Sequence, residues 1–416
     1  MGIFTLQRNV LTRVMLFAAP LFIIASGGCG GGSSVATNPA PDDVPADAAA
    51  GITVDGPDYS IGGSVINIAG GGEYVVSGAM LDGGVVVDAP GEVVNVVLSG
   101  ATIRNSNGPA ILAKAASSVR ITLSDGAVNV LSDGGADEDH DAAIFSSVPL
   151  VLDGDGALDV TGNNQEGIAS DSTLTVNGGN IRVAAVDDGL NSGEGIVING
   201  GYIYIDSVGD GIDSNAALTI NGGTIISLGG KMDDGLDADE AVLLNGGTII
   251  ATGANNSTPD ASSSQKYILL SFGDVQAPGT MVHIEENDGT EIVTFKPAKE
   301  YEGFLFSSDA LRSGVVYSVY SGGEYDGSER DDGLCAGGTY SGGTRLSHFN
   351  SGSADEDFII SGTGGVFSLG EGQQAPVSPG GALPPADGGL PPGHAGDPGG
   401  PQPLVSGDMP QVGQRP

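Results

Sequence analysis

Apolar residues in the middle of the chain recur in short runs in which every second position is apolar and the positions between are polar or small. This period of two is typical of strands with one buried face. When the runs are aligned, residues of similar size fall into four columns. The columns are Leu174, Ile196, Leu218 and Val242; Val176, Ile198, Ile220 and Leu244; Ile181, Ile203, Ile225 and Ile249; and Ile168, Leu190, Ile212 and Leu236. Each repeat is therefore predicted to hold two or three short strands.

Two further markers define the repeat that produces these columns. The first is a glycine that follows an acidic residue, at Gly167, Gly189, Gly211 and Gly235, with spacings of 22, 22 and 24 residues. The second is an Asn-Gly-Gly phrase with the same spacings, beginning at Asn177, Asn199, Asn221 and Asn245. Both markers lengthen at the same place, so they belong to one repeat. A period of this size in a β-rich sequence indicates a stacked solenoid.

We therefore predict an all-β fold in which residues 51–256 form a parallel β-helix with a repeat of 22 to 24 residues per coil. Its coils would lie about 4.8 Å apart, with the aliphatic columns filling the interior. The Gly-Gly pairs would form corners whose backbone geometry residues with a Cβ resist. The four asparagines would stack as an amide ladder. A leucine-rich repeat has a similar length, but its helix-forming half is missing here.

Acidic residues occur in phase with the repeat, so stacking would bring them together on one edge. Between Glu166 and Glu240 the chain holds 13 acidic residues and two basic ones. Two carboxylates about 5 Å apart repel by about 3 kcal/mol at an effective dielectric constant near 20. A cation with oxygen ligands would compensate, and calcium accepts irregular oxygen shells. The alternative is a solvated acidic edge that only keeps the protein soluble. The acids in phase are Glu166, Asp187, Asp188, Asp210, Asp213, Asp233, Asp234 and Asp237.

The whole chain of 416 residues carries a formal charge of −38. This acidity argues against nucleic acid or an anionic membrane surface as an electrostatic partner. The high glycine content, together with plentiful aliphatic residues, suits a solenoid with many tight turns better than a disordered chain.

Residues 1–29 are predicted to be an export signal. Arg8 and Arg13 form its basic region, and Val14–Ala25 forms an apolar core that is too short to span a membrane. Cys29, followed by Gly-Gly-Gly-Ser-Ser, resembles the lipidated cysteine of a bacterial lipoprotein signal. The alternative is an ordinary cleaved signal with an incidental cysteine. We expect the protein to be exported and lipid-anchored to the bacterial cell envelope or cell surface, with residues 30–50 as a flexible tether.

The regular repeat ends after Gly253. Residues 257–370 retain strand-like runs joined by turns, which predicts a β-rich C-terminal extension formed either by further coils or by a cap. Residues 371–416 are rich in proline and glycine and have no apolar periodicity, so we predict a disordered tail.

The phrases Leu174-Thr-Val-Asn-Gly-Gly-Asn-Ile, Asp187-Asp-Gly-Leu-Asn and Asp210-Gly-Ile-Asp, with Leu311-Arg-Ser-Gly-Val-Val-Tyr, resemble a bacterial family of secreted carbohydrate-binding proteins. Its members are right-handed β-helices that bind calcium, cellulose and polygalacturonate, and are similar in fold to family 9 pectate lyases. In those lyases an Asp-Asp-x-x-Asp cluster, with a carboxylate from the preceding coil, holds the catalytic calcium. The resemblance implies calcium ligands at Asp187, Asp188, Asn191, Asp210, Asp213, Asp233, Asp234 and Asp237.

Three functions are compatible with these features. The first, which the sequence favours, is a non-catalytic, calcium-dependent protein that binds acidic or plant-wall-type polysaccharides. Tyr202 and Tyr204, which alternate with apolar residues, would stack on sugar rings, and Arg182 would contact a uronate; ordinary exposed strand residues are the alternative. The second is a polysaccharide lyase, but its base would have to be Lys231 or Lys266, and neither lies in a recognisable motif. The third is an adhesin or structural surface protein stabilised by calcium.

Overall fold

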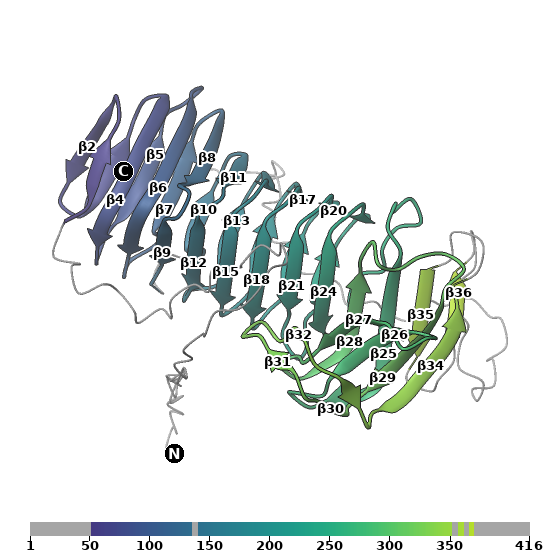
Figure 1. Cartoon of the computed structure of the whole chain (residues 1–416). Helices are drawn as coiled ribbons and strands as arrows, with labels where there is room; N and C mark the ends of the chain where they lie inside the picture. The colour runs from purple at the N-terminus through teal and green to yellow at the C-terminus, as the bar shows by residue number, and fades with distance from the viewer. Residues whose placement is uncertain (1–50, 135–139, 352–356, 362–365, 370–416) are drawn as a thin grey trace, which may run out of the picture. The chain divides into compact units, whose positions relative to one another are not determined.

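The computed structural model describes residues 51–134, 140–351, 357–361 and 366–369. These residues lie in one compact unit, which spans Met1–Ala375. All their regular elements are β-strands (Figure 1), and none of the described residues forms a helix long and apolar enough to cross a membrane. The predicted signal with Cys29, the tether and the C-terminal tail lie outside the described residues.

One side of the solenoid is a nine-stranded sheet in which each coil contributes one strand. Apart from the antiparallel β2–β3 pair, neighbouring strands in this sheet are parallel. In sheet order the strands are β2 (Tyr59–Gly62), β3 (Val65–Ile68), β5 (Gly84–Asp88), β7 (Ile111–Ala115), β10 (Ile144–Ser146), β13 (Ile168–Ser170), β16 (Leu190–Ser192), β19 (Ile212–Ser214) and β22 (Leu236–Ala238).

The other sides of the coils belong to a 19-stranded sheet, which also includes strands of the C-terminal extension. Its solenoid strands are β1 (Thr53–Asp55), β4 (Gly72–Met80), β6 (Val93–Arg104), β8 (Ser118–Leu123), β9 (Val128–Ser132), β11 (Leu150–Gly154), β12 (Ala157–Gly162), β14 (Thr173–Val176), β15 (Asn180–Ala185), β17 (Gly195–Ile198), β18 (Tyr202–Ser207), β20 (Leu218–Ile220), β21 (Thr224–Leu228), β23 (Val242–Leu244) and β24 (Thr248–Gly253).

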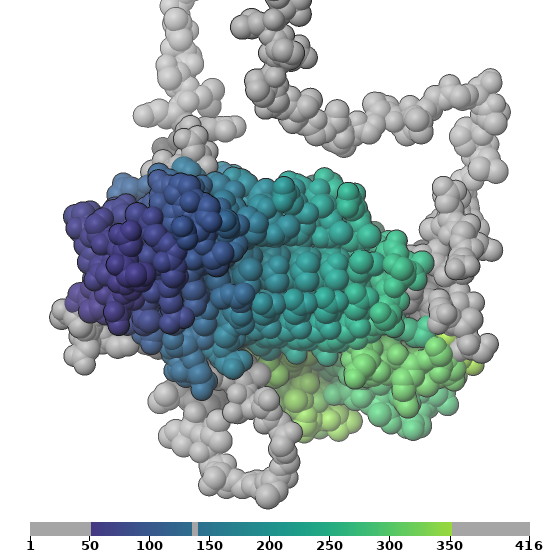
Figure 2. All heavy atoms as spheres, turned by 90° about the horizontal axis from the view of Figure 1, so that it is seen from above, coloured from purple at the N-terminus to yellow at the C-terminus, as the bar shows by residue number. Residues whose placement is uncertain are grey.

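The register confirms the four aliphatic columns. Leu174 pairs with Ile196, and Ile181 pairs with Ile203, so residues of one column lie directly over each other in successive coils. These side chains are almost completely buried and form a continuous core along the solenoid. Figure 2 shows the atoms of successive coils in parallel rows (teal). The predicted all-β parallel solenoid with a β-rich extension is therefore confirmed.

The Asn-Gly-Gly corners form the predicted amide ladder. The Nδ2 of Asn199 donates to the Oδ1 of Asn177 (2.9 Å), and the next two asparagines continue the series at 2.8 and 3.0 Å. The second glycine of each phrase has a left-handed φ; at Gly201, for example, φ is 95°. Such a conformation is strained for any residue with a Cβ. The repeated glycines are therefore required by the backbone path of each coil.

The C-terminal extension ends the stack of coils. β28 pairs antiparallel with β24, so the extension is a cap and does not continue the parallel coils. Its apolar core packs on outward residues of the solenoid, including Ile226 and Ile250. Its strands are β25 (Tyr267–Gln276), β26 (Val282–Glu286), β27 (Glu291–Phe295), β28 (Tyr301–Ser307), β29 (Val316–Ser321), β30 (Glu324–Tyr325), β31 (Ser328–Glu329), β32 (Cys335–Ala336), β33 (Tyr340–Ser341), β34 (Thr344–Asn350), β35 (Asp357–Ser361) and β36 (Val366–Leu369).

Candidate metal site on the acidic corner

The repeated segments in which an acidic residue directly precedes a glycine form a corner, at which each coil enters the nine-stranded sheet. We call residues 187–191, 210–213 and 233–237 the acidic corner. Asn191, Asp213 and Asp237 are paired in register on β16, β19 and β22. The glycine in each line is required by packing: a Cβ on Gly211 would lie 1.9 Å from the Oγ of Ser227. The sequence phrase thus places acidic side chains at the same position in consecutive coils.

Backbone hydrogen bonds hold the carboxylate that directly precedes the glycine of each coil in a fixed orientation. The Oδ1 of Asp188 accepts a hydrogen bond from the N–H of Asp210 at 2.7 Å. The Oδ1 of Asp210 accepts one from the N–H of Asp234 in the next coil. The Oδ1 of Asp234 accepts one from the N–H of Asn255 at 2.9 Å. Each carboxylate therefore uses one oxygen to bind the coil that follows it.

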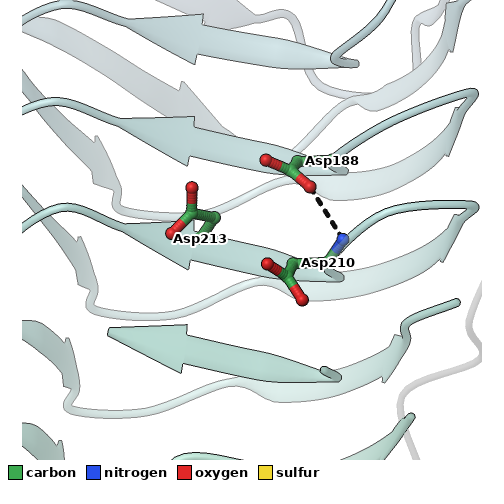
Figure 3. Close-up of side chains that lie close together, drawn as sticks. All are labelled: Asp188, Asp210 and Asp213. Atoms are coloured by element: carbon green, nitrogen blue, oxygen red, sulfur yellow. Dashed lines mark hydrogen bonds between the residues drawn. The ribbon is translucent and has the colours of Figure 1, made fainter. Parts of the chain in front are cut away.

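Asp188, Asp210 and Asp213 form a compact group of carboxylates (Figure 3). One oxygen from each lies within 4.8 Å of the others, close enough to share one cation. The Nδ2 of Asn191 donates to the Oδ2 of Asp188 at 3.2 Å and to the Oδ2 of Asp213 at 2.9 Å. Asn191 therefore joins the group through its amide.

Crowding and burial make these carboxylates hard to ionise. Burial, and after it the neighbouring carboxylates, raise the pKa of Asp213 to about 6. Burial is also the main cause that raises the pKa of Asp210 to about 7, against the hydrogen bond from the Asp234 N–H, which lowers it. The pKa of Asp188 is raised by burial as well. A positive charge among the three would remove this penalty.

The donor set fits a hard cation. All three side chains offer carboxylate oxygens, the ligand type that calcium prefers. Among the described residues no Lys or Arg forms an ion pair with any of the three, so no cationic side chain compensates their charge. A calcium ion held there would supply the missing positive charge.

The other predicted ligands flank this group. Burial raises the pKa of Asp234 to about 6. The pKa of Asp187 is also raised, first by burial and then by Asp233. The Oδ1 of Asp237 already accepts hydrogen bonds from the N–H of Ala238 and the Oγ of Ser257, both at 2.9 Å. The structure thus brings Asp188, Asp210, Asp213 and Asn191 together and places Asp187, Asp233, Asp234 and Asp237 around them.

Glu166 lies on the same edge one coil earlier, and its side chain is buried. It is 9% exposed, and its Oε2 has no hydrogen-bond partner. Burial, and then Asp141, raise its pKa to about 8. Sequence reasoning placed Glu166 on this edge but missed Asp141. The signal for Asp141 is weak because its coil lacks the acid-Gly phrase and carries Asp141-Ala-Ala instead.

Tyr202, Tyr204 and Arg182 lie on the outer face of the solenoid sheet, as predicted, but they are only partly exposed to solvent. The guanidinium of Arg182 lies 5.2 Å from the ring centroid of Tyr204, and its Nη2 lies 3.4 Å from the Oδ2 of Asp331. The Tyr202 hydroxyl donates to Asp332. The extension therefore packs on these side chains and covers part of them. Their predicted role in sugar binding remains a prediction.

The fold and the corner define a class of protein: a parallel β-solenoid with a carboxylate group that can hold a cation. The chain belongs to the family described as carbohydrate-binding domain-containing proteins, whose model matches residues 62–353. A relative of that description from Acetivibrio thermocellus is 34% identical over 190 residues, which cover 42% of this chain and 66% of the relative. The chain thus matches slightly less than two thirds of the relative's length.

One solved structure is also similar. It is described as the polysaccharide lyase-like protein from C. thermocellum in a gadolinium derivative. The identity is 31%, the match covers 46% of this chain and 87% of that chain, and the TM-score is 0.40.

Proposed function

We propose that this protein binds polysaccharide at the cell surface through calcium on the acidic corner, without catalysing a reaction. The observation that carries the proposal is the group formed by Asp188, Asp210 and Asp213, whose oxygens converge within 4.8 Å. Membership of the carbohydrate-binding domain family supports a polysaccharide as the partner. Calcium on the corner would provide the contact between the two.

The charge of the chain favours an acidic or plant-wall-type glycan that needs a cation to bind. At −38 the protein repels uronate carboxylates in the absence of calcium. A calcium ion held by three carboxylates has oxygen positions to spare, since its shell takes about six to eight oxygens. A glycan carboxylate or hydroxyl would complete that shell. The same charge argues against nucleic acid as a partner.

The lysines near the corner support a binding protein over a lyase. The Nζ of Lys231 is paired with the Oε2 of Glu300 at 2.9 Å. The Nζ of Lys299 donates to the carbonyls of Ser207 and Leu228 and is paired with Asp206. Both ammonium groups therefore contact oxygen atoms of the protein, and neither forms an ion pair with Asp188, Asp210 or Asp213.

The N-terminal segment completes the proposal. Export by the signal in residues 1–29, lipidation of Cys29 and a tether over residues 30–50 would hold the solenoid at the cell envelope. The protein would then meet insoluble polysaccharide outside the cell. Its only association with a membrane would be through this lipid.

A binding screen across plant, algal and bacterial polysaccharides, run with calcium and with excess EGTA, tests the proposal. We expect retention on at least one acidic or plant-wall glycan with calcium, and its loss in EGTA or in the variant Asp188→Asn/Asp210→Asn/Asp213→Asn. A matched control is Asp125→Asn/Asp155→Asn/Asp171→Asn, which removes the same charge from exposed positions. Equal binding by both variants would contradict the proposed site.

The same samples test for catalysis. Absorbance of unsaturated uronate products should stay at background for the wild type and for Lys266→Ala. Products that form with the wild type and disappear in Lys266→Ala would identify a lyase instead.

A further inference from the structure

The loop at residues 330–333, between β31 and β32 of the extension, reaches the outer face of the solenoid. The Tyr202 hydroxyl donates to the carboxylate of Asp332. The Nη2 of Arg182 lies 3.4 Å from the Oδ2 of Asp331. Two adjacent aspartates of the extension therefore contact two of the side chains that the sequence predicts to bind glycan.

Asp332 anchors this loop. Its side chain is 1% exposed, and its Oδ2 lies 2.6 Å from the Nη2 of Arg330. Its Oδ1 accepts a hydrogen bond from the N–H of Leu334 at 2.9 Å. Because separating a buried carboxylate from its partners is costly, Asp332 holds the loop on the solenoid whether or not a ligand is bound.

Asp331, by contrast, is held loosely. Its side chain is 61% exposed, and the 3.4 Å between its Oδ2 and the Nη2 of Arg182 is longer than an ordinary N–H···O hydrogen bond. Exposed ion pairs of this kind contribute little to stability. The Nε of Arg182 is buried and has no hydrogen-bond partner. The contact with Asp331 therefore leaves Arg182 incompletely hydrogen-bonded.

A guanidinium group binds a carboxylate best through two parallel N–H···O bonds. Asp331 accepts a hydrogen bond from one nitrogen of Arg182, Nη2, and its backbone belongs to the anchored loop. A carboxylate outside that loop is free to turn both of its oxygens toward the guanidinium. A uronate of a bound glycan meets this requirement, so Asp331 stands where a ligand carboxylate would bind.

Arg182 and part of the acidic corner lie on the same coil. Asp188 follows Arg182 by six positions, which is at most about 20 Å of extended chain. Between them, the side chains of Ala184 and Val186 are exposed, and both are small. An acidic glycan bound to calcium at the corner therefore has an open route to Arg182 along this coil.

We propose that Arg182 binds a second uronate of the glycan and that Asp331 occupies this position until the uronate replaces it. The inference rests on the proposed function, because calcium at the corner would hold the first uronate. Asp331 is then an internal competitor, which lowers the affinity for acidic glycans and leaves the binding of calcium itself unchanged. A neutral polysaccharide has no carboxylate to displace Asp331, so the exchange selects for acidic chains.

A double-mutant cycle tests this exchange. Oligogalacturonates long enough to span the distance from Asp188 to Arg182 are titrated by calorimetry, in calcium, into the wild type, Asp331→Asn, Arg182→Met and the double variant. The Arg182→Met change retains an unbranched apolar side chain against Tyr204. The matched control Glu324→Gln removes one exposed negative charge from the same extension. Calcium titration of each protein without glycan verifies that the acidic corner is intact.

We expect Asp331→Asn to bind the glycan about two- to fivefold more tightly than the wild type, which is the range for loss of an exposed ion pair. Arg182→Met should bind about 10-fold more weakly, and in that background Asp331→Asn should change nothing. Equal tightening by Glu324→Gln, tightening that persists with Arg182→Met, or no tightening at all would each overturn the inference. The proposed function would stand in all three cases, provided that the wild type binds in calcium and not in EGTA. Binding by none of these proteins would overturn both.

Discussion

The Oδ1 of Asp188 accepts a hydrogen bond from the backbone N–H of Asp210, 2.7 Å away on the next coil. Because a backbone donor holds this oxygen, the direction of the carboxylate is set by the stacking of coils. Hydrogen bonds from N–H groups favour the ionised carboxylate and so offset part of the cost of burial. The geometry of the corner therefore exists before any ion binds, which lowers the cost of ordering it.

Calcium should stabilise the folded protein, because the carboxylates converge only when the coils are stacked. Calcium at about 100 times its dissociation constant adds about 2.7 kcal/mol to the free energy of unfolding. For a domain of this size we expect a rise in Tm of about 4 °C in differential scanning calorimetry. The variant Asp188→Asn/Asp210→Asn/Asp213→Asn should show no such rise. Wild-type curves that coincide in calcium and in EGTA would contradict the metal site.

The stability of the calcium-free protein should depend on pH through Asp210 and Asp213. Burial raises their pKa values to about 7 and about 6, from an ordinary value of 3.8. Between the ordinary pKa of 3.8 and these raised pKa values, the folded chain retains protons that the unfolded chain has released. The contribution of these groups to stability therefore falls as the pH rises from about 4 to about 7 and is constant above. Calcium affinity should change in the opposite direction, because the ion needs ionised ligands.

Melting curves in EGTA across this pH range test whether the stability contributed by Asp210 and Asp213 falls as the pH rises. The Asp210→Asn variant has no proton to lose at that position, so its stability should depend less steeply on pH than that of the wild type. Parallel profiles for the two proteins would show that Asp210 has an ordinary pKa in the folded state.

The periodic part of the fold could be predicted from the sequence, because its determinants are local and repeated. The column of Ile181 and Ile203 and the ladder of Asn177 and Asn199 follow from one spacing, and the structure confirms both. The acidic edge follows from the same spacing. The particular group of Asp188, Asp210 and Asp213 does not, because it depends on side-chain directions that hydrogen bonds across coils determine.

The covering of Tyr202 could not be predicted in the same way. Its partner Asp332 lies 130 residues further along the chain, outside the repeat, and no period relates the two positions. The alternation of Tyr202 with Ile203 correctly indicates an outward ring. It contains no information about an extension that packs on that face.

The amide ladder should contribute measurably to stability. Asn221 donates to the Oδ1 of Asn199 at 2.8 Å and accepts from Asn245 at 3.0 Å. Asn221→Ala removes both bonds and should cost about 1–2 kcal/mol in urea unfolding. Asn221→Asp should cost more at neutral pH, because its carboxylate cannot donate to the Oδ1 of Asn199 and places a negative charge against that oxygen. The matched control Asn215→Ala, an exposed asparagine outside the ladder, should have little effect. Equal costs at both positions would show that the ladder adds nothing.

Cys29 should determine where the protein resides. In a bacterial host that processes lipoproteins, we expect the wild type in the membrane fraction and labelled by a fatty-acid precursor. Cys29→Ser should be released into the soluble fraction without label, because no other lipid attachment is predicted. The control Cys335→Ser replaces the buried free cysteine and should remain membrane-bound. Membrane retention of Cys29→Ser would contradict lipidation at this residue.

Substitution of the adjacent aspartates Asp233 and Asp234 tests whether the acidic corner holds one cation site or more than one. Changing both to Asn keeps their size, and an amide oxygen at 234 can still accept the hydrogen bond from the N–H of Asn255. Without calcium the variant should be slightly more stable, because it removes two carboxylates that repel their neighbours. It also removes the cost of burying the Asp234 carboxylate, whose pKa is raised by burial. With calcium it should be less stable than the wild type, because amides are weaker ligands for a hard cation. Titration calorimetry should show one weakened site while the group centred on Asp210 still binds. Unchanged stoichiometry and affinity would show that Asp233 and Asp234 form a solvated edge beside a single site.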